Sequence, residues 1–449
     1  MPPKPASRRP AIAVLGASGL LSLKFFLFIS VFAVNVFYFD QWAFLTPFFR
    51  GNPGLRELFL WQHGPPRLGL GLVLVKPLYE ITHWNTRVEG FCAGACIFLA
   101  MCLALWLKTK LSGGFSYWDV AIPLIFLTLT QYETFLGATN PAYGAIPLLL
   151  ILVYCLGLLL PNHLVRYLLI VALNFLLIYT GFGFFMGLVT LAAFAYECLR
   201  RIHGRSQIPL AHSIVAGLLA AASLASFFVH YRFDPAADCF GHAPWTWYPR
   251  FIALTFSAFL GPRTPFTLVT VAGFVGLAVA LAFFGMNGLK LLHSPEKKAV
   301  PRSERARLII AVLMGYSMLF TFSAAAGRAC LAPEAGQAPR YSTLMIPVYF
   351  GIYLFLLMLP PGFLRTVALP LFLLVVAPGG VLWPNDAGKK LADGKRAWAA
   401  CFLAHGDVRY CDRETGFPIY PNPESIDLQG KLNYLKQHRL SFFYDASQP

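Results

Sequence analysis

Charged residues are scarce in this sequence. Asp, Glu, Lys and Arg make up 12% of its 449 residues, whereas 57% are hydrophobic. A soluble globular chain carries about 25% charged residues, so half that level indicates that lipid is the solvent for much of the chain. The formal net charge of +16 is therefore interpreted by position, as a signal of membrane topology. Nucleic acid is not an expected partner.

The sequence also lacks the motifs of several soluble enzymes. It has no Walker motif, no GxGxxG fingerprint, no HExxH and no pair of CxxC motifs, so neither ATP hydrolysis nor structural zinc has support. No internal repeat is visible, and few charges fall inside apolar runs. Transporters depend on repeated halves and mid-membrane polar groups. A flippase or transporter of lipid-linked glycans therefore stays open only as an alternative.

A series of long apolar runs dominates the chain. Each is about 17–25 residues long, which is the length that crosses a bilayer core of about 30 Å. The segment 245–263 is too short and too rich in interfacial aromatics, and is predicted to lie along the membrane surface. The runs predict an all-α polytopic membrane protein with about 11 transmembrane helices, at residues 20–38, 89–107, 118–135, 144–160, 164–180, 183–198, 212–230, 265–289, 307–325, 343–359 and 365–383.

Lys and Arg in the short connections set the expected orientation. With this number of spans, all the basic clusters fall on one side, which is assigned to the cytoplasm. The sequence thus predicts a bacterial inner-membrane protein with a cytoplasmic N-terminal segment (1–19), a transmembrane domain (20–384) and a small extracytoplasmic C-terminal tail (385–449). A large first outer loop, 39–88, is expected to contain interfacial helices.

The cysteines divide into two groups. Five lie in or at the ends of predicted spans, where a thiol behaves as a small apolar residue. The other four fall on the predicted outer side, and their even number there indicates two disulfides. The local pair is Cys401–Cys411, which leaves Cys239 to bond Cys330. Free thiols or another pairing stay open.

Ionisable side chains gather in the predicted outer loops. Such groups are costly near a bilayer unless they pair or function. Arginines can bind a phosphate bidentately and stabilise it as a leaving group, and a carboxylate can take a proton from a hydroxyl or hold a metal that does so. The first loop supplies Asp40, Gln62, His63, Arg67 and His83, and later loops supply Glu133, Arg328, Arg340 and Tyr341.

The order of the outer motifs resembles that in the GT-C superfamily of integral-membrane glycosyltransferases. That class includes protein O-mannosyltransferases and the aminoarabinose transferase that acts on lipid A. The resemblance covers about residues 20–385 together with the tail. It rests on "DQW" directly after the first span, "QHGPPRLGL", "THWNTRVE", "QYE" after the third span, and "GR…PRYST" near the last two spans.

This resemblance implies a GT-C-like fold and an enzyme. It would transfer a sugar, with inversion, from a polyprenyl-phosphate donor to an extracytoplasmic glycan, lipid or protein acceptor, with membrane lipids as further partners. The acid that opens the first loop maps to Asp40, as catalytic base or as ligand of an activating divalent cation (Mg²⁺ or Mn²⁺). Many members have a second acid beside it. Here that neighbour is Gln41, so Glu133 is the expected second catalytic acid.

The other site residues are assigned by their location alone. The candidate substrate-binding residues are His63, Arg67, Gln62, His83, Arg328, Arg340 and Tyr341, and no metal ligand is assigned. Structural roles stay open for each of them: a helix cap for Asp40, a snorkelling anchor for Arg67, ion pairing for Glu133 and the other arginines. An O-antigen ligase or polymerase-type transferase is also an alternative, although such enzymes carry their large outer loop late in the chain.

Overall fold

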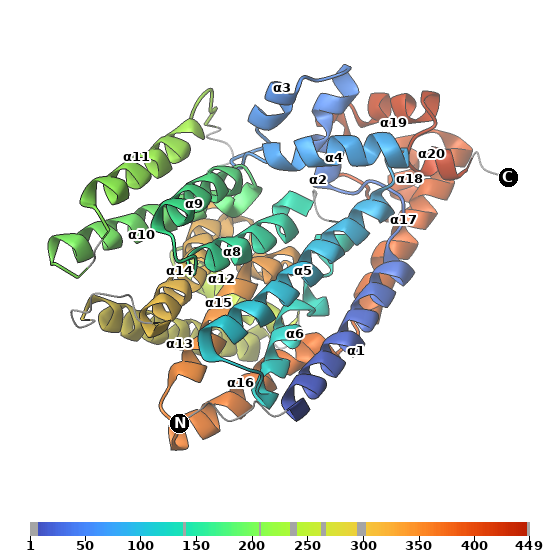
Figure 1. The fold of residues 1–449 in the computed structure, drawn as a ribbon. Coiled ribbons are helices and arrows are strands. Elements are labelled where there is room, and N and C mark those ends of the chain that lie inside the picture. The colour runs from blue at the N-terminus through green and yellow to red at the C-terminus, as the bar shows by residue number, and fades with distance from the viewer. Residues whose placement is uncertain are drawn as a thin grey trace.

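The computed structural model describes residues 8–137, 141–205, 208–233, 240–261, 266–293 and 302–446, which form α-helices and short 3₁₀ helices without a β-strand (Figure 1). Seven segments are long and apolar enough to cross a membrane. They contain α1 (Arg8–Phe32), α5 (Thr86–Ser112), α10 (Phe184–Ile202), α13 (Phe266–Leu292), α14 (Arg302–Arg328), α15 (Pro339–Met358), and α16 (Phe363–Val381) with α17 (Asn385–His405).

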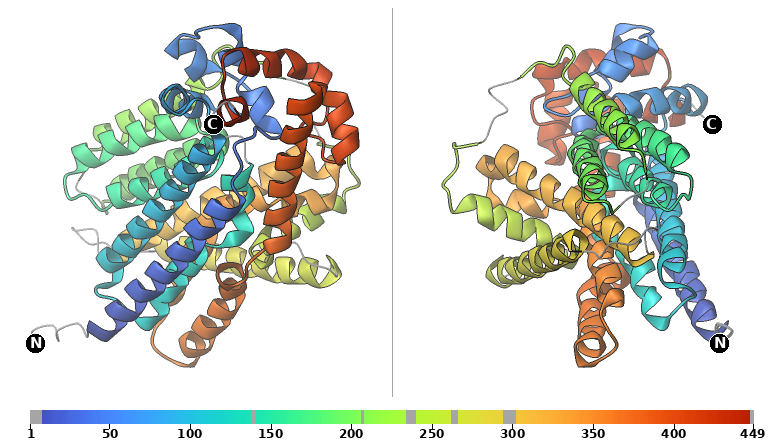
Figure 2. Two further views of the ribbon diagram at one scale, coloured as in Figure 1. Left: turned by 90° about the vertical axis from the view of Figure 1, so that its right-hand side faces the viewer. Right: turned by 60° about the vertical axis from the view of Figure 1, so that its left-hand side comes forward.

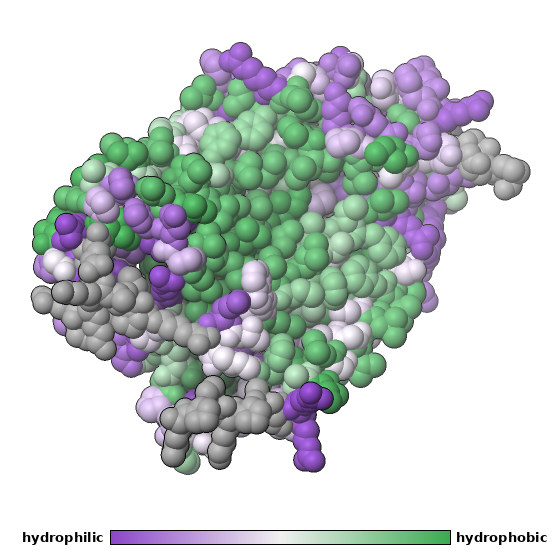
Figure 3. Space-filling view, in the orientation of Figure 1, coloured by the Kyte–Doolittle hydropathy of each residue, from purple (hydrophilic) through white to green (hydrophobic). Residues whose placement is uncertain are grey.

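Three shorter apolar helices complete the main body, α8 (Ala145–Gly157), α9 (His163–Ile178) and α11 (Leu210–Ser226). The surface of this body is strongly apolar, with a broad hydrophobic face below a hydrophilic upper end (Figure 3). Large side chains such as Leu20, Leu168, Leu268 and Leu374 stand exposed on four different helices. Contiguous apolar surface of this kind is expected where lipid covers a protein, so the expectation of an all-α membrane protein is supported.

The predicted span at 118–135 is not one helix. It is divided into η2 (Tyr117–Val120), α6 (Ala121–Phe126), η3 (Leu129–Gln131) and α7 (Glu133–Leu136). The break is buried, and protein side chains supply hydrogen bonds there. Gln131 Nε2 donates to Phe126 O (2.6 Å), and Thr343 Oγ1 donates to Gln131 Oε1 (2.9 Å). Broken backbone is tolerated at membrane depth only where protein surrounds it.

The segment predicted to lie along the membrane surface is also packed into the body. It forms α12 (Trp247–Phe256) and η7 (Ser257–Leu260). Phe251, Leu254 and Phe259 are fully buried, and α12 packs against α13 and α14. The helix is too short to span a bilayer, as expected, but its apolar side chains face other helices rather than lipid.

A buried ion pair joins α5 to η2 at the end of the body near the N-terminus. Lys108 and Asp119, 3% and 0% exposed, lie 2.5 Å apart (Nζ to Oδ2). Lys108 also donates to Gly114 O, and Tyr353 of α15 donates to the other oxygen of Asp119. Both charges therefore have further hydrogen bonds, which is the condition for burying an ion pair at acceptable cost.

The opposite end is closed by two segments that are far apart in sequence (Figure 2). The first loop (residues 33–85) contains α2 (Asp40–Phe44), η1 (Thr46–Arg50), α3 (Leu55–Leu60) and α4 (Gly69–Thr82). The tail (residues 385–446) contains α17, α18 (Val408–Thr415), η10 (Pro423–Ile426), α19 (Leu428–Gln437) and α20 (Phe442–Asp445). Loop and tail share one hydrophobic core, which includes Trp42, Phe44, Leu58, Leu72, Tyr79, Trp398, Phe402, Leu428, Leu432 and Leu435.

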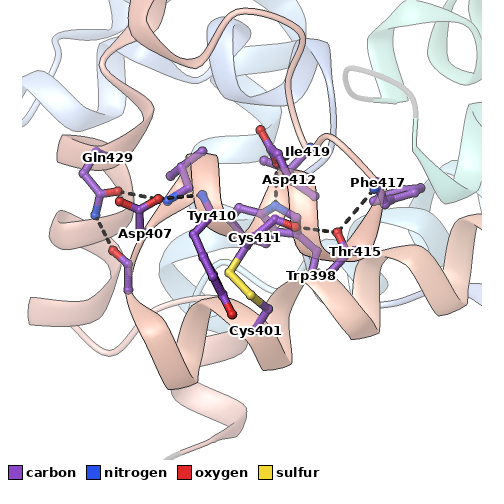
Figure 4. The surroundings of a disulfide bond; sticks show 12 residues. Trp398, Cys401, Asp407, Tyr410, Cys411, Asp412, Thr415, Phe417, Ile419 and Gln429 are labelled. Atoms are coloured by element: carbon purple, nitrogen blue, oxygen red, sulfur yellow. Dashed lines mark hydrogen bonds between the residues drawn. A yellow bond between two sulfur atoms is a disulfide. The ribbon is translucent and has the colours of Figure 1, made fainter.

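A disulfide braces the tail (Figure 4). Cys401 on α17 is bonded to Cys411 on α18, which confirms the predicted local pair. Next to it, Trp398 Nε1 donates to Asp412 Oδ1 (2.7 Å), and the same oxygen accepts from Ile419 N (3.2 Å). The predicted Cys239–Cys330 bond involves Cys239, which lies outside the described residues.

The buried ion pair leads to a prediction about stability. Asp119→Asn leaves Lys108 buried without its counter-ion, so we expect a loss of about 3–5 kcal/mol in unfolding free energy. Asp393→Asn is the matched control, because the Asp393–Arg396 pair is 52% and 56% exposed and such pairs contribute about 0–1 kcal/mol. The measurement is the unfolding free energy of both variants in the same detergent. Equal melting behaviour would contradict the structural role of Asp119.

Candidate active site

Asp40 is held by a constrained turn of the first loop. It begins α2, and the preceding residue, Phe39, has φ 53°. Positive φ is unfavourable for a bulky residue and persists only where surrounding structure imposes it. The tail supplies that constraint, because Phe39 N donates to Ile419 O (2.9 Å). The direction of the Asp40 side chain is thus set by a contact between the two segments.

Gln41 explains why a second acid is missing next to Asp40. Its side chain is 4% exposed; Oε1 accepts from Tyr38 N (2.9 Å) and Nε2 donates to Glu89 Oε2 (3.3 Å). Tyr79 donates to the same Glu89 oxygen (2.6 Å). An ionised carboxylate at position 41 could not donate to Glu89. Glu89 was not assigned a role from the sequence, although it is the last residue of the motif "THWNTRVE".

Asp40, His63 and Arg328 converge from different parts of the chain. The charge of Asp40 acts on both His63 and Arg328, and the charge of Arg328 acts on His63. Within the described residues, none of these three side chains forms an ion pair or a hydrogen bond. A carboxylate, an imidazole and a guanidinium therefore lie near one another, and each can still form hydrogen bonds or ion pairs with a ligand.

Burial lowers the pKa of His63 below its usual value. Asp40 opposes this shift, and Arg328 and Lys431 add to it. A lowered pKa keeps the imidazole neutral at neutral pH, so it can accept a hydrogen bond on one nitrogen and donate on the other.

Glu133 and Arg340 form the second part of the site. Arg340 Nη1 lies 3.3 Å from Glu133 Oε2, and both side chains are about three-quarters buried, at 24% and 28% exposed. Asp40 acts electrostatically on both. Arg340 Nε and the Tyr143 hydroxyl are enclosed and have no hydrogen-bond partner in the described part of the chain. Tyr341 lies beside them, within reach of the charges of Arg328 and Arg340.

A hollow of about 280 Å³ opens onto this pair. Aromatic rings form much of its wall, and Tyr38 stacks on Phe417 of the tail with ring centroids 5.2 Å apart. Lys390 on α17 adds a cation at the rim. The hollow therefore offers rings, a carboxylate and two cations. Its wall includes Tyr38, Phe39, Tyr132, Glu133, Arg340 and Phe417.

The tail contributes residues that were not assigned from the sequence. Lys431 on α19 donates to Trp42 O (2.7 Å) and Thr46 Oγ1 (2.8 Å), and its charge reaches His63. Burial lowers the pKa of Lys431 to about 8. Tyr420 lies near Asp40, and burial together with that carboxylate raises its pKa. A pattern within the polar tail could not reveal these contacts, since their partners lie almost 400 residues earlier.

Three of the predicted site residues lie elsewhere. Arg67 is 1% exposed; it donates to Val229 O and lies over the Phe227 ring (5.7 Å). Gln62 bonds the backbone of Arg232 in both directions. His83 stacks on Tyr444 of the tail, with ring centroids 4.2 Å apart. All three connect the first loop to neighbouring segments by these contacts.

The structure brings the other predicted site residues together. They are Asp40, Glu133, His63, Arg328, Arg340 and Tyr341.

A divalent cation does not fit these residues well. Among the described residues, no three His, Cys, Asp or Glu side chains are placed to hold a metal ion. Glu133 is already paired with Arg340, and a cation beside Asp40 would face the positive charges of Arg328 and Arg340. The expected Mg²⁺ or Mn²⁺ stays a prediction.

Comparison with models of protein families, with curated proteins and with solved structures found no match. The resemblance of the short motifs to GT-C enzymes therefore has no support from overall similarity. A function for this chain has to be inferred from the chemistry of its clustered side chains.

The Gln41–Glu89 contact next to Asp40 leads to a prediction about stability. Gln41→Glu removes the buried donor to Glu89, so we expect about 1–3 kcal/mol lower stability. Glu89→Gln in the same background should restore much of this, because an amide again faces a carboxylate. Thermal unfolding of the two single variants and the double variant forms a double-mutant cycle. Strict additivity would contradict the contact.

Proposed function

We propose that this chain is a membrane glycosyltransferase of GT-C type that transfers a sugar from a polyprenyl-phosphate donor to an extracytoplasmic acceptor. One observation carries the proposal: Asp40, His63 and Arg328 meet at one end of the helical body without pairing with other described residues. A catalytic base and a phosphate ligand must both be free in this way. Side chains with a purely structural role would be expected to pair.

The depth of the cluster suits a lipid-linked phosphate. Arg328 is the last residue of α14, and Arg340 is the second residue of α15. Asp40 follows the end of α1 by a few residues. All three thus lie where apolar helices end, the level at which a lipid phosphate is found. The adjoining apolar surface (Figure 3) would accommodate the polyprenyl chain.

The proposed reaction is a single displacement at the anomeric carbon. Asp40 accepts the proton of the acceptor hydroxyl as its oxygen forms a bond to that carbon. The bond from the carbon to the phosphate oxygen breaks, and the phosphate leaves as an anion held by Arg328 and by Arg340, whose Nε has no partner among the described residues. Arginine suits this role because its planar fork binds phosphate oxygens in pairs. Neutral His63 and Tyr143 can hydrogen-bond the sugar or the acceptor.

The proposed topology has eleven spans in the inner membrane of a bacterium. In it, the three shorter apolar helices and the broken segment from η2 to α7 count as spans alongside the seven longer segments. The N-terminus is then cytoplasmic, and the end that carries the first loop and the tail is extracytoplasmic. The Cys401–Cys411 disulfide supports this, since such bonds persist in oxidising compartments.

Asp40→Asn tests the base. We expect transfer to fall by about 10²–10⁴-fold, the usual contribution of a general base, with unchanged expression and melting temperature. The measurement is transfer from a synthetic polyprenyl-phosphate sugar in detergent or proteoliposomes. Glu57→Gln, an exposed acid of the same loop, should retain full activity. Wild-type activity of the Asp40 variant would refute its assignment.

Arg328→Lys tests phosphate binding. It keeps the charge but loses the bidentate fork, so we expect the KM for the donor to rise about tenfold, equivalent to about 1.4 kcal/mol. Arg250→Lys is the matched control, because the Arg250 guanidinium already pairs with Glu334 (2.9 Å). If both variants gave the same donor KM as the wild type, Arg328 would not bind the phosphate.

A further inference from the structure

A large cleft lies between the first loop and the tail, and it shares no lining residue with the hollow at Glu133. Its volume is about 770 Å³, within the 300–1,000 Å³ range typical of ligand sites. The first loop supplies one wall and η10 with α19 supply the other. The walls include Phe49, Arg50, Trp61, Asn433, Tyr434 and Gln437.

The charged groups of the cleft are already engaged by the protein. Lys431 donates to Trp42 O and Thr46 Oγ1 and lies 5.4 Å from the Phe49 ring. Asp427 accepts from Gly430 N at the start of α19 (3.1 Å). Glu424 pairs with Arg409. Arg50 lies over the Trp61 ring and has no ion pair among the described residues, so Arg50 and Lys431 remain in the wall as cations held by rings and neutral oxygens.

Aromatic rings and neutral amides form the rest of the cleft wall. Phe49 packs against Tyr434 across the junction of loop and tail, with ring centroids 5.5 Å apart. Trp61 is partly exposed, and Arg50 lies over its ring at 5.7 Å. Asn433 and Gln437 are exposed on successive turns of α19. Ring faces bind the apolar faces of sugars, and amides both donate to and accept from hydroxyl groups.

The cleft leads toward Asp40. Ala43 and Thr46, which line it, lie on α2 and η1 within two turns of the carboxylate. Lys431, also in its wall, acts electrostatically on His63 of the site. A ligand that fills the cleft would therefore have one end near the proposed base.

We infer that this cleft binds a saccharide chain and that the acceptor of the reaction is a glycan. Calling the bound saccharide the acceptor depends on the proposed function. The binding site itself is inferred from the cleft alone. In this arrangement the donor phosphate occupies the Arg328–Arg340 side. The acceptor chain occupies the loop–tail side and presents a terminal hydroxyl to Asp40.

Binding is tested without donor. The purified full-length protein in detergent is examined by saturation-transfer NMR and calorimetry with maltohexaose, cellohexaose, chitohexaose and mannohexaose as probes. We expect at least one of these to bind, with at least tenfold weaker binding in Trp61→Ala and in Asn433→Ala. Trp106→Ala, an exposed tryptophan on α5, is the matched control and should bind as the wild type does.

Three outcomes would overturn the inference. They are no binding of any probe, binding that neither cleft variant weakens, and Trp61-dependent binding of a Ser/Thr-rich hexapeptide in place of every saccharide. Asn433 is exposed, so its variant keeps the test valid should Trp61→Ala fail to fold. Asp40→Asn should bind the saccharide normally. Loss of transfer activity and loss of glycan binding can therefore be distinguished.

Discussion

Packing between the first loop and the tail determines the geometry of the whole site. Neither segment could bury its apolar side chains alone: the first loop has short helices, and the tail is polar over much of its length. Their shared core around Trp42, Trp398 and Leu432 provides the missing partner for each. Phe39 can be held at positive φ, and Lys431 can be buried against Trp42 O, only because this core is formed.

The electrostatics of the site follow from that packing. Charges near apolar surface are stabilised by pairing, and the ion pairs at Lys108–Asp119 and Arg200–Glu304 follow this rule. Asp40 and Arg328 depart from it, since each stays unpaired among the described residues while still acting on the other. Holding two such groups close without contact requires a rigid frame. A substrate that enters between them would gain the interactions that the protein forgoes.

Sequence reasoning succeeded where a signal is local. Apolar runs indicated the helical body, and Asp40, Glu133, Arg328 and Arg340, placed at the ends of those runs, lie at helix ends in the structure. Their roles stay predictions. It failed where partners are distant: nothing near Gln41 reveals Glu89, and nothing near Lys431 reveals Trp42. It also could not show that the run at 118–135 is broken, because a buried Gln131 and Thr343 replace the lost helical bonds. Arg67 was assigned as a ligand by its location in the first loop, but its burial became apparent only in the fold.

The joint core has a consequence for biosynthesis. The first loop is synthesised more than 300 residues before residues 398–443. At about 5–20 residues per second, the loop exists for tens of seconds before its packing partner does. During that interval the helical body can insert, but the turn that aims Asp40 has no support. A chain interrupted before residue 398 would then occupy the membrane without the packing that sets the direction of Asp40.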